Sequence, residues 1–113
     1  MSDCLFCRII AGNIPAQSVA DTEKLMAFLD IHPQAPTHIL IIPKKHIESM
    51  QTLQTEDAAL IAEMALLAQR LAKEQGLHEG FRLVFNSGAR AGQTVFHLHM
   101  HLLGGRDMHW PPG

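Results

Sequence analysis

Three histidines alternate with apolar residues near the end of the chain, where positions 97–101 read His-Leu-His-Met-His. They lie within an apolar run, residues 94–103, that ends at a pair of glycines. Because successive side chains of a strand point to opposite faces, this run predicts a strand with His97, His99 and His101 on one face, at intervals of about 7 Å. The apolar residues between them are expected to face the core.

A row of imidazoles suits chemistry better than packing. Imidazole has both its acid and its base form within reach near neutral pH, whereas Asp, Lys, Thr or Ser would serve as well on a merely wet surface. Two chemistries fit the row. One imidazole can attack phosphorus or an acyl carbon while its neighbours orient it and protonate the leaving group. Alternatively, two or three imidazoles can hold a metal that keeps an open position for water.

Size and charge limit the setting in which this chemistry takes place. The chain has 113 residues, which predicts a single domain over residues 1–113 whose core needs no disulfides. The formal net charge is -2 without a basic run, so nucleic acid is not an expected partner, although one small phosphate is. No apolar window is long enough to span a bilayer and the start of the chain has no signal-peptide pattern, which predicts a cytoplasmic protein without a membrane partner.

Hydrophobic patterns predict both helices and strands. Thr55, followed by two acidic residues, is typical of a helix start, and Gly76 is typical of a helix end. The apolar stripe between them predicts a helix of about twenty residues that covers a sheet. The other expected elements are a short helix over 5–10 and strands over 18–20, 25–29, 38–42 and 81–86, in addition to the histidine strand.

A glycine-containing segment, residues 87–94, leads into the histidine run. Glycines such as Gly88 and Gly92 let backbone amides approach an anion closely, because no Cβ stands in the way. Most short glycine loops are only turns. This one is notable because it delivers Gln93 and Thr94 to the start of the histidine row.

Several of these segments together resemble the histidine-triad (HIT) family. The stretch 93–103 is similar to the His-x-His-x-His signature, and the likeness extends to segments 30–38 and 42–47. The ending 103–113 is similar to the histidine-triad nucleotide-binding branch, called Hint. The resemblance implies a homodimeric α+β fold: an antiparallel sheet of about five strands, one long helix packed on it and a short N-terminal helix.

The resemblance also implies an activity, the hydrolysis of purine nucleoside phosphoramidates. His99 would be the nucleophile that forms a nucleotidyl-histidine intermediate, with His97 beside it and His101 in contact with the phosphate. Thr94 would place a hydroxyl near the leaving group, where the family commonly has Ser. His38 matches a fourth histidine that supports the triad, although a single histidine at the start of a strand is often structural.

The nucleotide contacts follow from the same likeness. Asn86, Gly92 and Gln93 would hold the phosphate and ribose, while Asp30 and Ile31 would meet the ribose and the base. Asp30 also has a physical argument, since a carboxylate can accept hydrogen bonds from both ribose hydroxyls. The expected ligand is a purine nucleoside monophosphate or phosphoramidate.

Cys4 and Cys7 form a Cys-x-x-Cys pair near the start of the chain. By itself the pair can bind zinc, form a redox couple or remain as two free buried thiols. The resemblance to bacterial relatives with this pair implies a closed structural zinc site completed by His46 and His97, with no catalytic metal. Such a site would tie residues 1–12 to the histidine strand.

The C-terminal tail, residues 104–113, contains the only tryptophan, Trp110. Chain ends usually fray, but two prolines and a large ring favour docking, and the Hint resemblance implies that the tail packs at the dimer interface near the partner's site.

Two other functions remain open. They are a metal-dependent hydrolase with the histidine row as ligands, and a nucleotide-binding regulatory module with vestigial activity.

Overall fold

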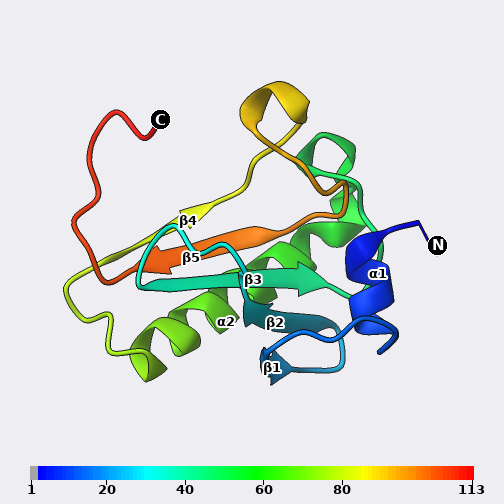
Figure 1. Cartoon of the computed structure of the whole chain (residues 1–113). Coiled ribbons are helices and arrows are strands. Elements are labelled where there is room, and N and C mark those ends of the chain that lie inside the picture. The colour runs from blue at the N-terminus through cyan, green and yellow to red at the C-terminus, as the bar shows by residue number, and fades with distance from the viewer. Residues whose placement is uncertain (1–2) are drawn as a thin grey trace.

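One antiparallel sheet with two helices forms the protein, as the computed structural model of residues 3–113 shows (Figure 1). The strands lie in the order β1-β2-β3-β5-β4. The expected α+β fold with five strands, one long helix and one short helix is thereby confirmed. The elements are α1 (Leu5–Ile10), β1 (Ser18–Asp21), β2 (Leu25–Leu29), β3 (Thr37–Pro43), α2 (Ala58–Glu74), β4 (Phe81–Val84) and β5 (Met100–Gly104).

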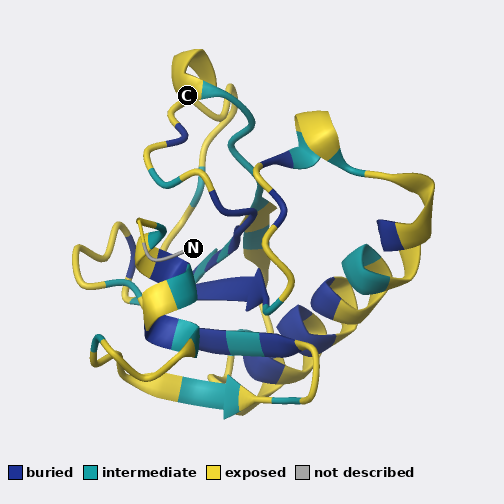
Figure 2. Cartoon of the chain, turned by 90° about the vertical axis from the view of Figure 1, so that its right-hand side faces the viewer, coloured by how far each residue is buried: buried dark blue, intermediate teal, exposed yellow. Residues whose placement is uncertain are grey.

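The long helix α2 covers one face of the sheet. Its buried stripe includes Met64, Leu67 and Leu71, which pack in one cluster with Ile39 and Ile41 of β3. These residues form the main core, and Figure 2 shows the buried segments of the long helix and of the central strands in dark blue. No helix formed by residues 3–113 is long and apolar enough to cross a bilayer.

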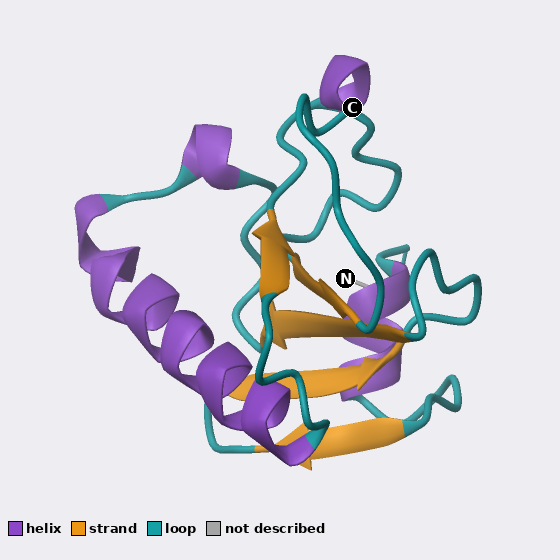
Figure 3. Ribbon diagram, turned by 90° about the vertical axis from the view of Figure 1, so that its left-hand side faces the viewer, coloured by secondary structure: helices purple, strands orange, loops and turns teal. Residues whose placement is uncertain are grey.

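The short helix α1 lies on the opposite face of the sheet from α2 (Figure 3). Phe6 and Ile9 of α1 pack in a second, smaller cluster with Phe28, Leu40 and Ile42. Because these strand residues alternate with those of the main core, the two faces of β3 are both buried. The N-terminal segment therefore supplies the cover for the face that carries the histidines.

The histidine run is not one continuous strand, so that prediction was wrong. β5 begins only at Met100, and His97 and His99 lie in the irregular segment before it. Leu98 donates its backbone N–H to the carbonyl of Ile47 at 2.6 Å, away from the sheet ladder. The ring centroids of His99 and His101 are 5.0 Å apart, closer than the 7 Å of a regular strand.

The start of the long helix also differs from the prediction. Residues Thr55–Asp57 form a 3-10 turn, and α2 runs for 17 residues from Ala58. The buried carboxylate of Asp57 accepts the backbone N–H of Gln54 at 3.0 Å and so closes the 3-10 turn. It makes no side-chain cap hydrogen bond to α2 itself.

Cross-strand pairing brings two histidines from distant parts of the chain together. His101 of β5 lies directly opposite Leu40 of β3, and His38 lies two residues before Leu40 on the same face. Val84 of β4 lies opposite His101 on its other side. Diagonal neighbours of this kind are within reach of large side chains, so the register alone places His38 beside His101.

Candidate active site and metal centre

His97 is fully buried, and its two ring nitrogens face different partners. Nε2 lies 2.8 Å from the carbonyl oxygen of Pro43, and since a carbonyl only accepts, Nε2 must carry the ring proton. Burial lowers the pKa of His97 to about 4, so the ring is neutral near pH 7. Nδ1 of His97 therefore carries no proton and has a lone pair that can accept a hydrogen bond or bind a metal ion.

His99 is held in the opposite tautomer. Its Nδ1 lies 2.7 Å from the backbone carbonyl oxygen of His97, so Nδ1 donates and Nε2 carries the lone pair. Burial lowers the pKa of His99 below its usual value, although the charge of Asp30 opposes this effect. The ring is neutral at pH 7, and an imidazole in this form can attack an electrophile without first losing a proton.

A hydrogen-bond chain from Gln34 sets the tautomer of His101. The backbone N–H of Gln34 donates to Nδ1 of His38 at 3.0 Å, which leaves the ring proton of His38 on Nε2. That N–H lies 2.8 Å from Nδ1 of His101, which must accept it. The proton of neutral His101 is then on Nε2.

Nε2 of His101 is a buried donor without a hydrogen-bond partner among residues 3–113. Burial, followed by the neighbouring His99 and His38, lowers the pKa of His101 to about 4, so it donates as a neutral group. An unsatisfied buried donor costs about 1–3 kcal/mol. Such a cost is typical of a functional site, where a ligand supplies the missing acceptor.

Phe6 of α1 forms a wall beside the histidines. Its ring packs edge-on against those of His99, at a centroid distance of 5.1 Å, and His97, at 5.9 Å. The contact contributes to the burial of both imidazoles, and burial is the main cause of their lowered pKa values. The N-terminal helix thus helps to keep both rings neutral.

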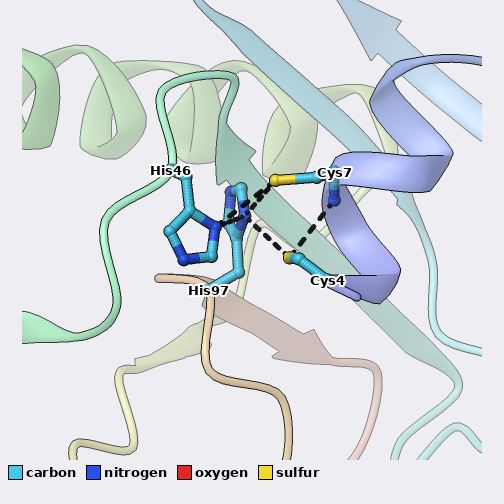
Figure 4. A group of neighbouring side chains, drawn as sticks. All are labelled: Cys4, Cys7, His46 and His97. Atoms are coloured by element: carbon cyan, nitrogen blue, oxygen red, sulfur yellow. Dashed lines mark hydrogen bonds between the residues drawn. The ribbon is translucent and has the colours of Figure 1, made fainter. Parts of the chain in front are cut away.

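Four potential metal ligands converge next to this wall, and we call Cys4, Cys7, His46 and His97 the Cys/His cluster (Figure 4). Nδ1 of His97 lies 3.2 Å from Nδ1 of His46, 3.4 Å from Sγ of Cys4 and 3.6 Å from Sγ of Cys7. Nδ1 of His46 lies 3.3 Å from Sγ of Cys7. Ligands at ordinary zinc distances on a tetrahedron are about 3.3–3.8 Å apart, so the residues fit a tetrahedral metal ion.

The chemistry of the donor set supports the same reading. Metal-bound histidines usually donate their other N–H to a carbonyl or carboxylate, as His97 does to Pro43. Burial and the adjacent Cys4 raise the pKa of the Cys7 thiol, so a cation is needed to favour the thiolate form. The cluster borders a cavity of about 890 Å³, and His46 is exposed, which gives an ion a route in.

A second group of potential ligands, Asp30, His38 and His101, does not fit a metal. Nδ1 of His38 accepts the Gln34 N–H, so its Nε2 keeps the proton and has no lone pair to offer. The same N–H faces Asp30 Oδ2 at 3.4 Å and His101 at 2.8 Å. The three triad histidines therefore do not converge on one ion, contrary to the alternative in which they all act as ligands.

Gln93 braces the glycine loop from inside. Its side chain is buried; Oε1 accepts the N–H of Gly88, while Nε2 donates to the carbonyls of Glu48 and Val95. Both donor hydrogens are used within the protein, and the backbone N–H of Gln93 also donates, to the carbonyl of Gly88 at 3.1 Å. Gly92 adopts a left-handed conformation, φ +99°, which explains why glycine is needed there.

Among the other expected nucleotide contacts, Asp30 lies beside His38, and the rest differ in exposure. Asp30 follows β2; one oxygen accepts the His32 N–H and the other faces His38. Ile31 is 85% exposed, so its side chain is available to contact a ligand. Thr94 is exposed beside the cavity next to the Cys/His cluster, and Asn86 follows β4, close in sequence to Val84.

Which backbone groups the imidazoles meet, and the contact of one aromatic ring, could not be identified from the sequence. The carbonyls of Pro43 and His97 and the N–H of Gln34 fix the three tautomers. Main-chain groups have no signature in a sequence. Phe6 had a weak signal, its place between the two cysteines, but its contact with His99 depends on how α1 packs.

The site places a neutral imidazole with a lone pair, His99, beside an imidazole that donates an N–H, His101. A model of the HIT domain matches residues 11–108, and the chain therefore belongs to the HIT family. An uncharacterized HIT-like protein of Synechocystis is 48% identical over 98% of this chain and 97% of its own.

Two solved structures are similar over nearly the whole chain. A HIT family hydrolase from Legionella pneumophila has a TM-score of 0.95 and 52% identity, and the match covers 97% of this chain and 99% of that one. A histidine triad nucleotide-binding protein from Candida albicans has a TM-score of 0.81 and 33% identity, covering 96% of this chain and 82% of that one. The sheet and both helices thus follow the family fold.

Substitution of His38 tests the hydrogen-bond chain. His38→Leu removes the donor to His101 and should lower kcat about tenfold to a hundredfold, because a buried nitrogen loses its partner. His38→Gln can still donate an amide N–H and should retain more activity than the leucine variant. Steady-state kinetics of both variants provide the measurement; equal losses would mean that His38 acts through packing alone.

Proposed function

We propose that the protein hydrolyses purine nucleoside phosphoramidates through a nucleotidyl intermediate on His99. The observation that carries the proposal is the pair of tautomers. His99 has a lone pair on Nε2, and the adjacent ring of His101, at a centroid distance of 5.0 Å, has a proton on Nε2. A phosphoryl group needs both a nucleophile for phosphorus and a donor for its oxygen.

The reaction proceeds in two displacements. Nε2 of His99 bonds to the α-phosphorus, the bond from phosphorus to the leaving nitrogen breaks, and that nitrogen takes up a proton that solvent supplies by way of the Thr94 hydroxyl. His101 donates to a non-bridging oxygen throughout. Water then attacks the phosphorus and gives up a proton to solvent, the bond to His99 breaks with its electron pair returning to Nε2, and a nucleoside monophosphate leaves. His97 and His38 are positioning residues, because they act through the rings of His99 and His101.

The nucleotide is assigned to the surface around the triad. Asp30 and Ile31 hold the ribose and base, since a carboxylate suits the two ribose hydroxyls and an exposed aliphatic side chain suits a purine face. Asn86, Gly92 and Gln93 are assigned to the phosphate side. The hydrolase from Legionella pneumophila and the nucleotide-binding protein from Candida albicans support this assignment by their similarity.

Zinc is the metal proposed for the Cys/His cluster. Two sulfurs and two imidazole nitrogens at tetrahedral spacing favour zinc over metals that prefer oxygen. All four positions are taken by protein ligands, so the ion would supply a rigid cross-link between residues 1–12 and the triad segment. The reaction itself uses no metal.

The proposed assembly is a homodimer. β4 is an edge strand, and its Phe81 and Leu83 are about 40% exposed, while Leu66 of α2 is 65% exposed. An open edge next to apolar side chains favours pairing with a second copy. Residues 104–113 would then pack against the partner. This contact would cover Trp110, which is 85% exposed in the single chain.

A trapped intermediate tests the proposal directly. The protein is mixed with adenosine 5'-phosphoramidate, quenched within milliseconds under alkaline conditions that preserve phosphohistidine bonds, and analysed by intact mass and peptide mapping. We expect one nucleotidyl group on His99. Turnover without any adduct on His99, under conditions in which chemically prepared nucleotidyl-histidine survives, would contradict the proposed mechanism.

The pH profile of kcat/KM follows from the lowered pKa of His99. Burial disfavours its protonation, so the free enzyme should stay active as the pH falls through 6.5, the ordinary histidine value, and lose activity only below it. Rates from pH 4.5 to 8, with metal content and circular dichroism followed in parallel, check this expectation. Half-loss of activity at or above pH 6.5, in folded and metal-loaded protein, would contradict it.

A further inference from the structure

His97 belongs to both the metal-ligand cluster and the nucleophile's support. Its ring nitrogen Nδ1 faces the sulfurs of Cys4 and Cys7 at 3.4 and 3.6 Å. Its backbone carbonyl oxygen accepts the Nδ1–H of His99 at 2.7 Å. One residue therefore connects the two sites, and no other side chain has to move for one to affect the other.

The peptide group that joins His97 to Leu98 is held on both edges. Its carbonyl accepts from His99, and its N–H donates to the carbonyl of Ile47 at 2.6 Å. Ile47 directly follows His46, the second histidine of the cluster. A cation held by His46 and His97 would thus join the two segments whose backbone orients the His99 ring.

Without a cation, the carbonyl of Pro43 and the ring of Phe6 still hold the buried ring of His97, but its Nδ1 meets only the two thiols and His46 among the described residues. The thiols offer only weak contacts at 3.4 and 3.6 Å, and the exposed His46 is free to turn into solvent. The peptide after His97 can then tilt, which lengthens its hydrogen bond to His99. Both tautomers of His99 become accessible, and the one protonated on Nε2 cannot attack.

We propose that metal occupancy of the Cys/His cluster sets the tautomer and orientation of His99 through the backbone carbonyl of His97. The proposal rests on the function proposed above, in which His99 is the nucleophile. It gives the metal a control over reaction rate in addition to its structural role. A misplacement of this kind affects the chemical step more than substrate binding.

The test compares zinc-loaded protein with protein freed of metal by a chelator, at a temperature well below unfolding. Nitrogen-15 NMR of labelled histidine reports the tautomer of His99, identified by the signal that is missing from His99→Ala. We expect a single Nδ1–H form with zinc and a mixture of tautomers without it. With adenosine 5'-phosphoramidate, kcat should fall about tenfold to a hundredfold while KM changes less than about threefold, and added zinc should restore both signals.

A pair of histidine variants supplies the matched comparison. His46→Ala removes an exposed ligand and should lower zinc affinity and reproduce the mixed tautomers of His99. His78→Ala removes an exposed histidine in the segment between α2 and β4 and should change neither. If the metal-free protein does not stay folded, His46→Ala with three remaining ligands provides the same measurement.

The failures of the two proposals are distinguishable. A folded, metal-free protein with an unchanged His99 spectrum and unchanged kcat would overturn the coupling while an adduct on His99 still supports the function. Failure to bind zinc at all would overturn the coupling as well. A zinc-loaded protein that forms no adduct would refute the function, whereas the NMR comparison would still show whether the metal sets the tautomer.

Discussion

Replacing His99 with alanine should lower kcat for adenosine 5'-phosphoramidate on the order of 10⁴-fold or more, because loss of a nucleophile removes the covalent route. Binding of a nucleoside monophosphate should persist, since the proposed contacts from Asp30 and the glycine loop remain. Steady-state kinetics and calorimetric titration with AMP measure the two effects separately. The nucleotidyl adduct should be absent from the variant.

His78→Ala is the control for this experiment, because it removes a histidine from an exposed position outside the site. Its activity should equal that of the parent. Circular dichroism of His99→Ala establishes that the buried position tolerates the smaller side chain. If His99→Ala were folded and turned over substrate as fast as the control, another group would have to be the nucleophile.

Removing the metal should lower the midpoint of thermal unfolding by roughly 15 °C or more. An ion that binds only the folded chain, at about a thousand times its dissociation constant, stabilises it by about 4 kcal/mol. In a domain of about this size each kcal/mol shifts the midpoint by roughly 4 °C. Scanning calorimetry of zinc-loaded and chelated protein measures the difference.

A double variant, Cys4→Ser with Cys7→Ser, should unfold at the temperature of the chelated protein and should not respond to zinc. Leu5→Ala lies between the cysteines on the exposed side of α1 and should keep both the zinc response and most of the stability. A zinc response that survived in the double variant would place the metal elsewhere. Equal midpoints for loaded and chelated protein would remove the structural role.

Much of the fold followed from local patterns. The hairpin of β1 and β2, the strand β3 and the helix α1 lie where turn residues and apolar runs predict them. The composition of the Cys/His cluster also agreed with what the family resemblance implied. These features depend on residues close in sequence or on motifs with a fixed spacing.

Contacts between distant segments could not be predicted in the same way. The alternation over residues 94–103 is equally compatible with a straight strand and with a bend before β5, and the bend is decided by the bond from Leu98 to Ile47. The roles of the ring nitrogens depend on which backbone group each one meets. That information exists only once β3, β5 and the loops are assembled.

The donor at the head of the chain that ends on His101 is the main-chain N–H of Gln34. Every amino acid except proline supplies that group, so a substitution of the Gln34 side chain leaves this hydrogen-bond donor in place. Position 34 can therefore accept other side chains while the proton of His101 stays on Nε2. Only a proline at position 34 would remove the N–H that bonds to His38.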